Sequence, residues 1–408
     1  MPPPIASMSS KQTHSWLEVL AVFLKLGLTS FGGPIAHIGY FRREFVDRRR
    51  WLTDEGFTDL VGLCQLLPGP ASSQVGFSVG LLRAGWRGAA AAWCGFTFPS
   101  VLLLIAFAAI APHLSGPVGE GVLHGLKLVA VAVVAQAVWD MARRLCPDHR
   151  RAGIALLSLG LLSVLNTVYA QLLVIASGAA LGMVVCGGAN SSVPSRPAYE
   201  FRVSRTAGMI ALILFLLLLL GVPALMDLSA NRILSVFDGF YRSGALVFGG
   251  GHVVLPLLQQ RTVDSGWVSP GVFLVGYGAA QAVPGPLFTF AAFLGWSMNE
   301  APNHWAGATL ATLGIFLPGM LLVVAALPFW QALRARPRMA AALSGVNAAV
   351  VGLLASALYS PVWTSAVHSA PDFAIATVAF LFLVRWRIPP LAIVALCSLL
   401  GIAEALWI

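Results

Sequence analysis

The run from Ala207 to Met226 holds twenty consecutive residues without a charged side chain, and it constrains the fold of the whole chain. A helix of this length spans the hydrocarbon core of a bilayer. At least eight other stretches are comparably apolar, and only 10% of the 408 residues are charged, whereas soluble proteins have about 25%. The alternation of apolar and polar residues typical of membrane β-barrels is absent. The sequence therefore predicts an all-α polytopic membrane protein.

The apolar stretches form two copies of one unit. QLLPGP, which ends at Pro70, returns as QAVPGP, which ends at Pro286, at an offset of 216 residues. The Phe-Gly-Gly that starts at Phe31 returns at Phe248, at an offset of 217. Each copy holds six apolar elements, which run over 16–46, 57–82, 86–112, 119–142, 152–167 and 169–187 in the first and over 233–260, 271–298, 304–330, 339–361, 371–385 and 388–407 in the second.

The predicted organisation has five parts. A polar tail covers 1–15, the first repeat 16–187, a polar linker 188–205, a connecting transmembrane helix 206–226 and the second repeat 232–408. The connecting helix has no counterpart ahead of the first repeat. Because each repeat crosses the membrane an even number of times, this unpaired crossing turns the second repeat upside down. We therefore expect inverted structural repeats, as in many secondary transporters.

Positive charge indicates which elements cross the membrane. If every element crossed, the arginine-rich loop 42–50 would lie on the opposite side from the other basic loops. If 16–46 and 57–82 are re-entrant and fold back at their breaks, all these loops lie in the cytoplasm. The sequence thus predicts four re-entrant hairpins with broken helices and nine spans in a bacterial inner membrane, with a cytoplasmic N-terminus and a periplasmic C-terminus. Thirteen full spans with broken helices are the alternative.

The Gly/Pro motifs are the predicted breaks. Proline removes a backbone donor, and glycine allows a positive φ and a close backbone approach. Non-helical backbone at this depth is tolerated where protein or a watery cavity satisfies it. Each half-helix that starts after a break offers free N–H groups and the positive end of its dipole. Four such ends converging from two repeats would form an anion site.

Intramembrane cations support an anion site. Lys25 and Arg242 lie six residues before the two Phe-Gly-Gly motifs, in equivalent positions of the repeats. Such charges often mark transport pathways, although snorkelling to the membrane surface also explains them. Lys127 lies within a spanning segment and is a third candidate, with pairing to Glu120 or Asp140 as the structural alternative. We expect Lys25 and Arg242, with the four break tips, to surround one anion near the bilayer midplane, and their alanine variants to lose transport without loss of protein from the membrane.

Two histidines and two glutamines complete the polar candidates. His37 and His252 follow the Phe-Gly-Gly motifs at non-equivalent positions, and either could donate to an oxyanion, relay protons or serve a structural role. Gln65 and Gln281 precede the Pro-Gly-Pro motifs at equivalent positions and could be neutral donors.

Other chemistries lack their sequence signatures. There is no P-loop, HExxH or GxSxG motif, so an enzyme or a directly ATP-driven pump is not predicted. The five cysteines show no CxxC spacing, and His113 and His124 stand isolated in the sequence. No cofactor or metal is therefore predicted.

The stretches FLKLGLTSFGGPIAHIGYFRREFVDRRRWLTDEGF, from Phe23 to Phe57, and FYRSGALVFGGGHVVLPLLQQ, from Phe240 to Gln260, are the most specific part of the sequence. With the two Pro-Gly-Pro motifs, they make the chain resemble the chromate ion transporter family in its long, two-domain form. The resemblance covers about residues 16 to 407, but the second half carries fewer charges than this family pattern. The family's motif residues correspond to Phe31, Gly32, Gly33, Pro34, His37, Pro68, Gly69, Pro70, Phe248, Gly249, Gly250, Gly251, His252, Pro284, Gly285 and Pro286. The predicted substrate site adds Lys25, Gln65, Lys127, Arg242 and Gln281.

The resemblance implies export of chromate, a tetrahedral oxyanion, driven by the proton motive force and giving chromate resistance. Protons would then be the coupling ion, and membrane lipid and other copies of the chain are further candidate partners. Import of sulfate or a related anion by the same fold is the alternative. A passive anion channel is a third reading, which the tight Gly/Pro breaks disfavour.

Overall fold

The computed structural model describes residues 15–165, 170–186, 203–228, 231–330 and 337–407. All regular structure within these ranges is helical. The predicted tail and most of the predicted linker 188–205 lie outside the described residues. Six helical segments there are long and apolar enough to cross a membrane, and one of them is the connecting helix, α8 (Arg205–Leu228). The predicted polytopic all-α fold is confirmed.

The first repeat begins with two broken helical hairpins. Its elements are α1 (Trp16–Thr29), α2 (Gly33–Arg42), the π-helix η1 (Arg43–Arg48), α3 (Asp54–Leu66), α4 (Ala71–Ile110), the 3-10 turn η2 (Ala111–His113), α5 (Gly116–Leu145), α6 (His149–Val164) and α7 (Ala170–Val185). Thr53 caps α3 by accepting from the Gly56 N–H.

Helix α4 consists of two antiparallel arms, 71–83 and 86–110. Ala84 and Gly85 have non-helical backbone angles between them. Gly80 and Gly88 face each other so closely that a Cβ on either would overlap the backbone of the other. In one continuous helix these residues would lie about 12 Å apart. The first arm therefore belongs to the hairpin of α3, and the second arm crosses the molecule.

Both hairpins return to the end of the molecule from which they start. At the start of α1, Glu18 forms an ion pair with Arg49, which follows η1, at 3.0 Å. The guanidinium groups of Arg49 and Arg83 lie 5.2 and 4.8 Å from the ring centre of Trp51. Since Trp51 precedes α3 and Arg83 ends the first arm of α4, all four hairpin ends meet here. This geometry fits the predicted re-entrant hairpins and not thirteen full crossings.

The second repeat has the same order of elements. They are α9 (Arg232–Ala245), η3 (Gly251–Val253), α10 (Val254–Thr262), α11 (Pro270–Ala280), η4 (Leu287–Thr289), α12 (Phe290–Trp296), α13 (His304–Ala326), η5 (Leu327–Phe329), α15 (Pro337–Ala357), the π-helix η6 (Leu358–Trp363), α16 (Ala370–Arg385) and α17 (Pro390–Trp407). Its hairpin ends also meet, because Arg232 is ion-paired with Glu300 and the Asn299 N–H donates to the Trp267 carbonyl.

Equivalent glycines set the closest helix contacts in both repeats. Gly27 of α1 packs against Gly95 and Phe96 of α4, and Gly244 of α9 packs against Ile315 of α13. These pairs are related by the offsets that align the sequence motifs, so the two repeats share one packing scheme.

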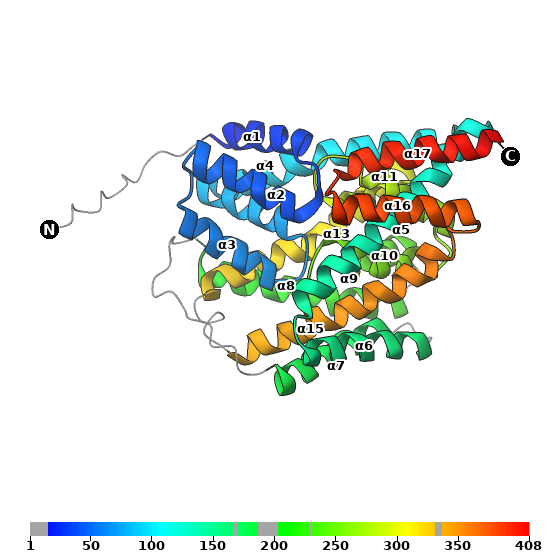
Figure 1. The fold of residues 1–408 in the computed structure, drawn as a ribbon. Helices are drawn as coiled ribbons and strands as arrows, with labels where there is room; N and C mark the ends of the chain where they lie inside the picture. Colours follow the sequence, from blue (N-terminus) through cyan, green and yellow to red (C-terminus); the bar gives the residue numbers. More distant parts are fainter. Residues whose placement is uncertain (1–14, 166–169, 187–202, 229–230, 331–336, 408) are drawn as a thin grey trace.

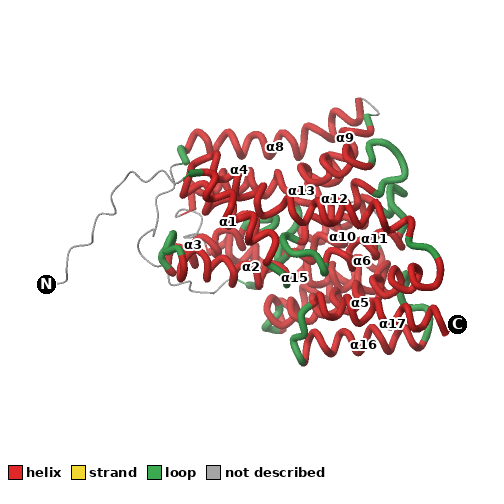
Figure 2. Tube along the Cα trace, turned by 90° about the horizontal axis from the view of Figure 1, so that it is seen from above, coloured by secondary structure: helices red, strands yellow, loops and turns green. Residues whose placement is uncertain are grey.

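The repeats run in opposite directions through the molecule. Figure 1 shows that α1 starts near the end where the N-terminus lies, whereas α17 finishes at the opposite end. Helix α8 runs along the length of the molecule and leads to α9 at the far end (Figure 2). Because α1 and α9 enter from opposite ends, the repeats are inverted, with α8 as the unpaired crossing helix.

Three predicted crossing elements are shorter than the others. Helices α6, α7 and α16 contain 16 residues each, about 24 Å at 1.5 Å per residue. They pack outside the long helices α5 and α15. On the surface of the molecule, α8 exposes Ile210, Leu217 and Leu220, as a lipid-facing helix does.

The hairpins of the two repeats differ in their packing against these long helices. Helix α11 packs along α5, and α10 contacts α15. Among the described residues, α2 and α3 have no comparable packing on α5 or α15. The inverted repeats are therefore in different conformations relative to the rest of the molecule.

Candidate functional site

The four breaks converge at the centre of the molecule through two reciprocal hydrogen bonds. The Gly285 N–H donates to the Ser30 carbonyl at 2.9 Å, and the Gly69 N–H donates to the Val247 carbonyl at 2.8 Å. Ser30 and Val247 are equivalent positions of the two repeats, as are Gly69 and Gly285. Each Pro-Gly-Pro tip thus bonds to the Phe-Gly-Gly tip of the other repeat. A pseudo-two-fold axis relates the two bonds.

Further contacts follow the same axis. Pro34 packs against its own equivalent, Gly251, where a Cβ would lie 3.1 Å from the proline Cγ. The Ser100 hydroxyl of α4 donates to the Pro284 carbonyl. The equivalent of Ser100 in α13 is Gly319, which lies against Gly69. The second arm of α4 and α13 therefore each support the Pro-Gly-Pro tip of the opposite repeat.

Glycine is required at these tips for two reasons. Gly69 and Gly285 have φ angles of +116° and +103°, which side chains of L-residues rarely adopt. A Cβ at Gly285 would also overlap the Ser100 hydroxyl, and one at Gly69 would lie 3.0 Å from the Cα of Gly319. The tips therefore have the close backbone approach that the sequence predicts.

The two equivalent intramembrane cations have different surroundings. Arg242 forms an ion pair with Asp238, one turn earlier in α9, at 2.8 Å, and it donates to the Leu219 carbonyl of α8. Lys25 is exposed on α1, and the position equivalent to Asp238 is Ala21. Among the described residues, neither cation bonds to a residue of the four breaks. The structure therefore does not bring Lys25 and Arg242 into one site with the tips.

The two predicted histidines are held by hydroxyl groups. His37 is fully buried, and its Nδ1 lies 3.4 Å from the Ser72 Oγ. His252 is partly buried, and its Nδ1 lies 2.7 Å from the Tyr277 hydroxyl. Gln281 donates weakly to the Tyr277 carbonyl at 3.4 Å, whereas its equivalent, Gln65, is exposed.

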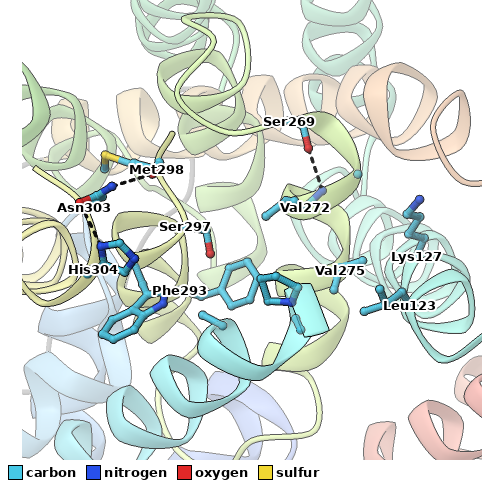
Figure 3. Close-up of a pocket in the computed structure, with 15 residues that line it drawn as sticks. Leu123, Lys127, Ser269, Val272, Val275, Phe293, Ser297, Met298, Asn303 and His304 are labelled. Atoms are coloured by element: carbon cyan, nitrogen blue, oxygen red, sulfur yellow. Dashed lines mark hydrogen bonds between the residues drawn. The ribbon is translucent and has the colours of Figure 1, made fainter. Parts of the chain in front are cut away.

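A cavity of about 520 Å³ lies at the end of the molecule where α17 finishes. Lys127 of α5 lines it and is the lining residue with a fixed positive charge. Figure 3 shows Lys127 and Leu123 on one side of the cavity and Asn303 and His304 on the opposite side. Lys127 forms no ion pair with Glu120, Asp140 or another described residue. Its charge faces the cavity near Gly271.

A family model for chromate transporters matches residues 17–183 and 234–402. The two matched segments coincide with the two structural repeats and leave out α8. The chain belongs to the chromate transporter family.

Relatives within this family match over almost the whole chain. The chain is 27% identical over 400 residues to a probable chromate transport protein of Synechococcus elongatus, with 95% of each chain covered. It is 28% identical over 356 residues to a chromate transport protein of Pseudomonas aeruginosa, with 87% of this chain and 80% of that protein covered. A shorter relative, the uncharacterized transporter YwrA of Bacillus subtilis, is 28% identical over 126 residues, which are 31% of this chain and 71% of its own length. No solved structure matches the chain.

The structure of this family member reveals polar residues that the sequence reasoning missed. Gln74, in the first turn of α4, donates to the carbonyls of both Pro68 and Gly319 and so links the two repeats. Ser100 holds the opposite tip, as described above. The signal available in the sequence was the clustering of Ser72, Ser73 and Gln74 directly after a Pro-Gly-Pro motif in an apolar segment.

His124 is not isolated, contrary to the expectation from the sequence. Its Nε2 lies 2.5 Å from the Oδ1 of Asp372, and a carboxylate oxygen of Glu404 completes a group of three within 4.8 Å of one another. The other oxygen of Asp372 accepts from the N–H groups of His368 and Ser369 and so caps α16. Sequence spacing could not show this group, because His124 of α5 lies more than 240 residues before Asp372 of α16 and Glu404 of α17. The group links these three helices at the periphery, away from the four breaks.

Proposed function

We propose that this chain is a secondary active transporter that exports chromate across a bacterial inner membrane, coupled to the proton motive force. The conclusion rests above all on the reciprocal bonds between the four breaks. Inverted repeats that meet through broken hairpins are the architecture in which a central site opens to alternate sides. The relatives named as chromate transport proteins supply the substrate of the proposal.

The unequal packing of the hairpins supports alternating access. The second-repeat hairpins pack on α5 and α15, whereas the first-repeat hairpins do not. If the first-repeat hairpins packed on the long helices and the second-repeat hairpins came away from them, the centre would become accessible from the other side of the membrane. The inverted repeat makes both arrangements available to one fold.

The distribution of charge supports the proposed orientation. At the end where α1 starts, arginines flank most of the described helix termini, whereas Arg232 and Arg261 flank those at the opposite end. Cytoplasmic loops of membrane proteins carry such an excess of positive charge. On this basis we propose that the N-terminus is cytoplasmic, the C-terminus is periplasmic, and the cavity lined by Lys127 faces the periplasm.

Everted membrane vesicles test this proposal. In vesicles that hold the protein, export from the cell becomes uptake into the lumen. We expect radiolabelled chromate to accumulate, excess sulfate to reduce the uptake, and a protonophore to abolish it. Vesicles without the protein are the control. Uptake that is unchanged after the gradient has collapsed would contradict proton coupling, and no uptake at all would contradict chromate export.

Whole cells separate export from sulfate import. An exporter lowers the cellular chromate content and leaves sulfate uptake unchanged. A rise in radiolabelled sulfate uptake, without a fall in cellular chromate, would favour the importer instead.

A further inference from the structure

Polar atoms with few or no hydrogen-bonding partners lie on the elements that flank the breaks of the first repeat. Each belongs to a side chain that is at most 2% exposed; the His37 ring is hydrogen-bonded to the Ser30 backbone, and the other four atoms have no partner among the described residues. They are Ser30 Oγ, His37 Nε2, Ser73 Oγ, Gln74 Oε1 and Thr97 Oγ1. Burial of an unpaired polar atom destabilises a fold, so this group calls for a role other than packing.

These residues lie between α1 and α2, on α2 and on both arms of α4. Ser73 lies in the first turn of α4, and His37 contacts the neighbouring Ser72. The His37 ring stands edge-on to Phe96 with 5.3 Å between the ring centres, and Phe96 precedes Thr97. The first intrahelical bond of α4 runs from the Gln74 N–H to the Pro70 carbonyl, so the N–H groups before Gln74 have no partner within the helix.

The available groups are mostly donors. If the neutral His37 ring accepts from the Ser72 hydroxyl at Nδ1, it carries its proton on Nε2, and the Ser30 backbone is the partner of this donor in the present conformation. The hydroxyls of Ser73 and Thr97 are two more donors. Together with the start of a helix, such donors suit a tetrahedral oxyanion and require no fixed cation.

The second repeat builds the same fold without these polar groups. The positions equivalent to Ser30 and His37 are Val247 and Val254, and those equivalent to Gln74 and Thr97 are Phe290 and Phe316; all four are buried. The equivalent of Ser73, Thr289, uses its hydroxyl within its own turn by donating to the Pro286 carbonyl. The fold that the two repeats share therefore does not need these polar residues. Whatever role they have is specific to the first repeat.

We propose that Ser73, Thr97 and His37 bind the transported oxyanion, so that the first repeat alone forms the binding site. This inference rests on the proposed function and names the residues that carry it out. The cluster is buried here and lies apart from the cavity lined by Lys127, so the anion enters when the tips separate during alternating access. The second repeat supplies the Gly285 tip that closes the site through its bond to Ser30.

Substitutions that remove only a hydroxyl test the assignment. Thr97→Val and Ser73→Ala each remove a buried unpaired oxygen, so the thermal stability of the purified protein without substrate should stay equal or rise. Chromate uptake into everted vesicles should show a KM raised at least about tenfold, as expected for the loss of one hydrogen bond to a charged group. Protection of the purified protein against heat by chromate or sulfate should weaken to the same extent.

Thr312→Val is the matched control. Thr312 is also buried, in α13, but its hydroxyl donates to the Ala308 carbonyl within the helix. Its removal should leave KM unchanged. If wild-type vesicles take up chromate and the Thr97 and Ser73 variants keep the wild-type KM, the binding assignment is wrong and the transport function stands. If wild-type vesicles take up neither chromate nor sulfate, the transport proposal itself fails.

Discussion

Equivalent residues of the two repeats have diverged in their local chemistry. Lys25 and Arg242 occupy the same position of the repeat, yet Arg242 is ion-paired with Asp238 and Lys25 has no ion-pair partner among the residues that the structure describes. Asp238 is 5% exposed, and the Arg242 guanidinium is the hydrogen-bonding partner of its carboxylate. The shared position predicts a shared role in transport, whereas the contacts give Arg242 a structural one.

Substitution of Arg242 should therefore lower protein stability. Arg242→Ala leaves the Asp238 carboxylate buried without its partner, which costs about 3–5 kcal/mol, so less folded protein should reach the membrane. Immunoblots of membrane fractions and thermal unfolding of the purified protein measure this. Lys25→Ala should keep wild-type protein levels and weaken transport.

A double variant separates charge pairing from substrate binding. Asp238→Asn combined with Arg242→Gln should recover much of the lost stability, because no unpaired charge remains. If Arg242→Ala alone keeps full protein levels and loses transport, Arg242 acts on the substrate and the structural assignment is wrong.

At the scale of elements, each half-helix is defined by the backbone geometry at its break. Gly69 and Gly285, the glycines of the Pro-Gly-Pro tips, have a positive φ, and a neighbouring atom occupies the space that a Cβ would need. The N–H of each glycine also donates to a carbonyl of the opposite repeat. Each Pro-Gly-Pro tip is held by the opposite repeat, so a substitution in either tip should disturb the contact between the two repeats.

Gly285→Ala and Gly69→Ala should reduce stability and transport together. A positive φ costs an alanine about 1–2 kcal/mol, and the overlap with Ser100 or Gly319 adds to it. Gly266→Ala is the control, since Gly266 has a φ of +72° but open space around it. Thermal unfolding of the purified variants should show a larger loss at the tips than at Gly266. An equal loss of thermal stability in all three variants would show that backbone strain alone explains it and that the close packing of the tips contributes nothing.

The unequal packing of α3 and α11 predicts unequal access to equivalent residues. In a variant without the five native cysteines, Gln65→Cys should react rapidly with a membrane-impermeant maleimide added to everted vesicles. Gln281→Cys should react slowly from either side, because Gln281 is partly buried at the end of α11, which packs on α5. Equal labelling rates would contradict the conformation described here.

At the scale of the whole molecule, α8 is the helix that makes the repeats inverted. It carries the chain from the end where α7 finishes (Figure 1) to the end where α9 begins (Figure 2). The basic loops of both repeats thereby lie at one end of the molecule, although the repeats point in opposite directions.

Fusions to the C-terminus test this topology. Alkaline phosphatase fused after Ile408 should be active, because that enzyme folds in the periplasm, and a green fluorescent protein at the same place should stay dark. The same reporters in the basic loop after Arg385 should give the reverse result. A fluorescent C-terminal fusion would overturn the proposed orientation.

The sequence determined the membrane class, the duplication, the breaks and the inversion. Each of these follows from local chemistry: uncharged runs of membrane length, Gly and Pro at fixed offsets, and one unpaired apolar helix. Positive charge near the hairpin ends also indicated their re-entrant course, which the contact of Glu18 with Arg49 matches.

Tertiary structure decided which side chains meet. The bond between Gly285 and Ser30 joins residues 255 positions apart, and the pair of His124 with Asp372 joins residues 248 apart. Periodicity within one segment carries no information on such contacts. For Lys25 and Arg242, the equivalence and the residues one turn earlier, Ala21 and Asp238, were visible in the sequence, whereas the bond of Arg242 to the Leu219 carbonyl depends on the packing of α8 against α9.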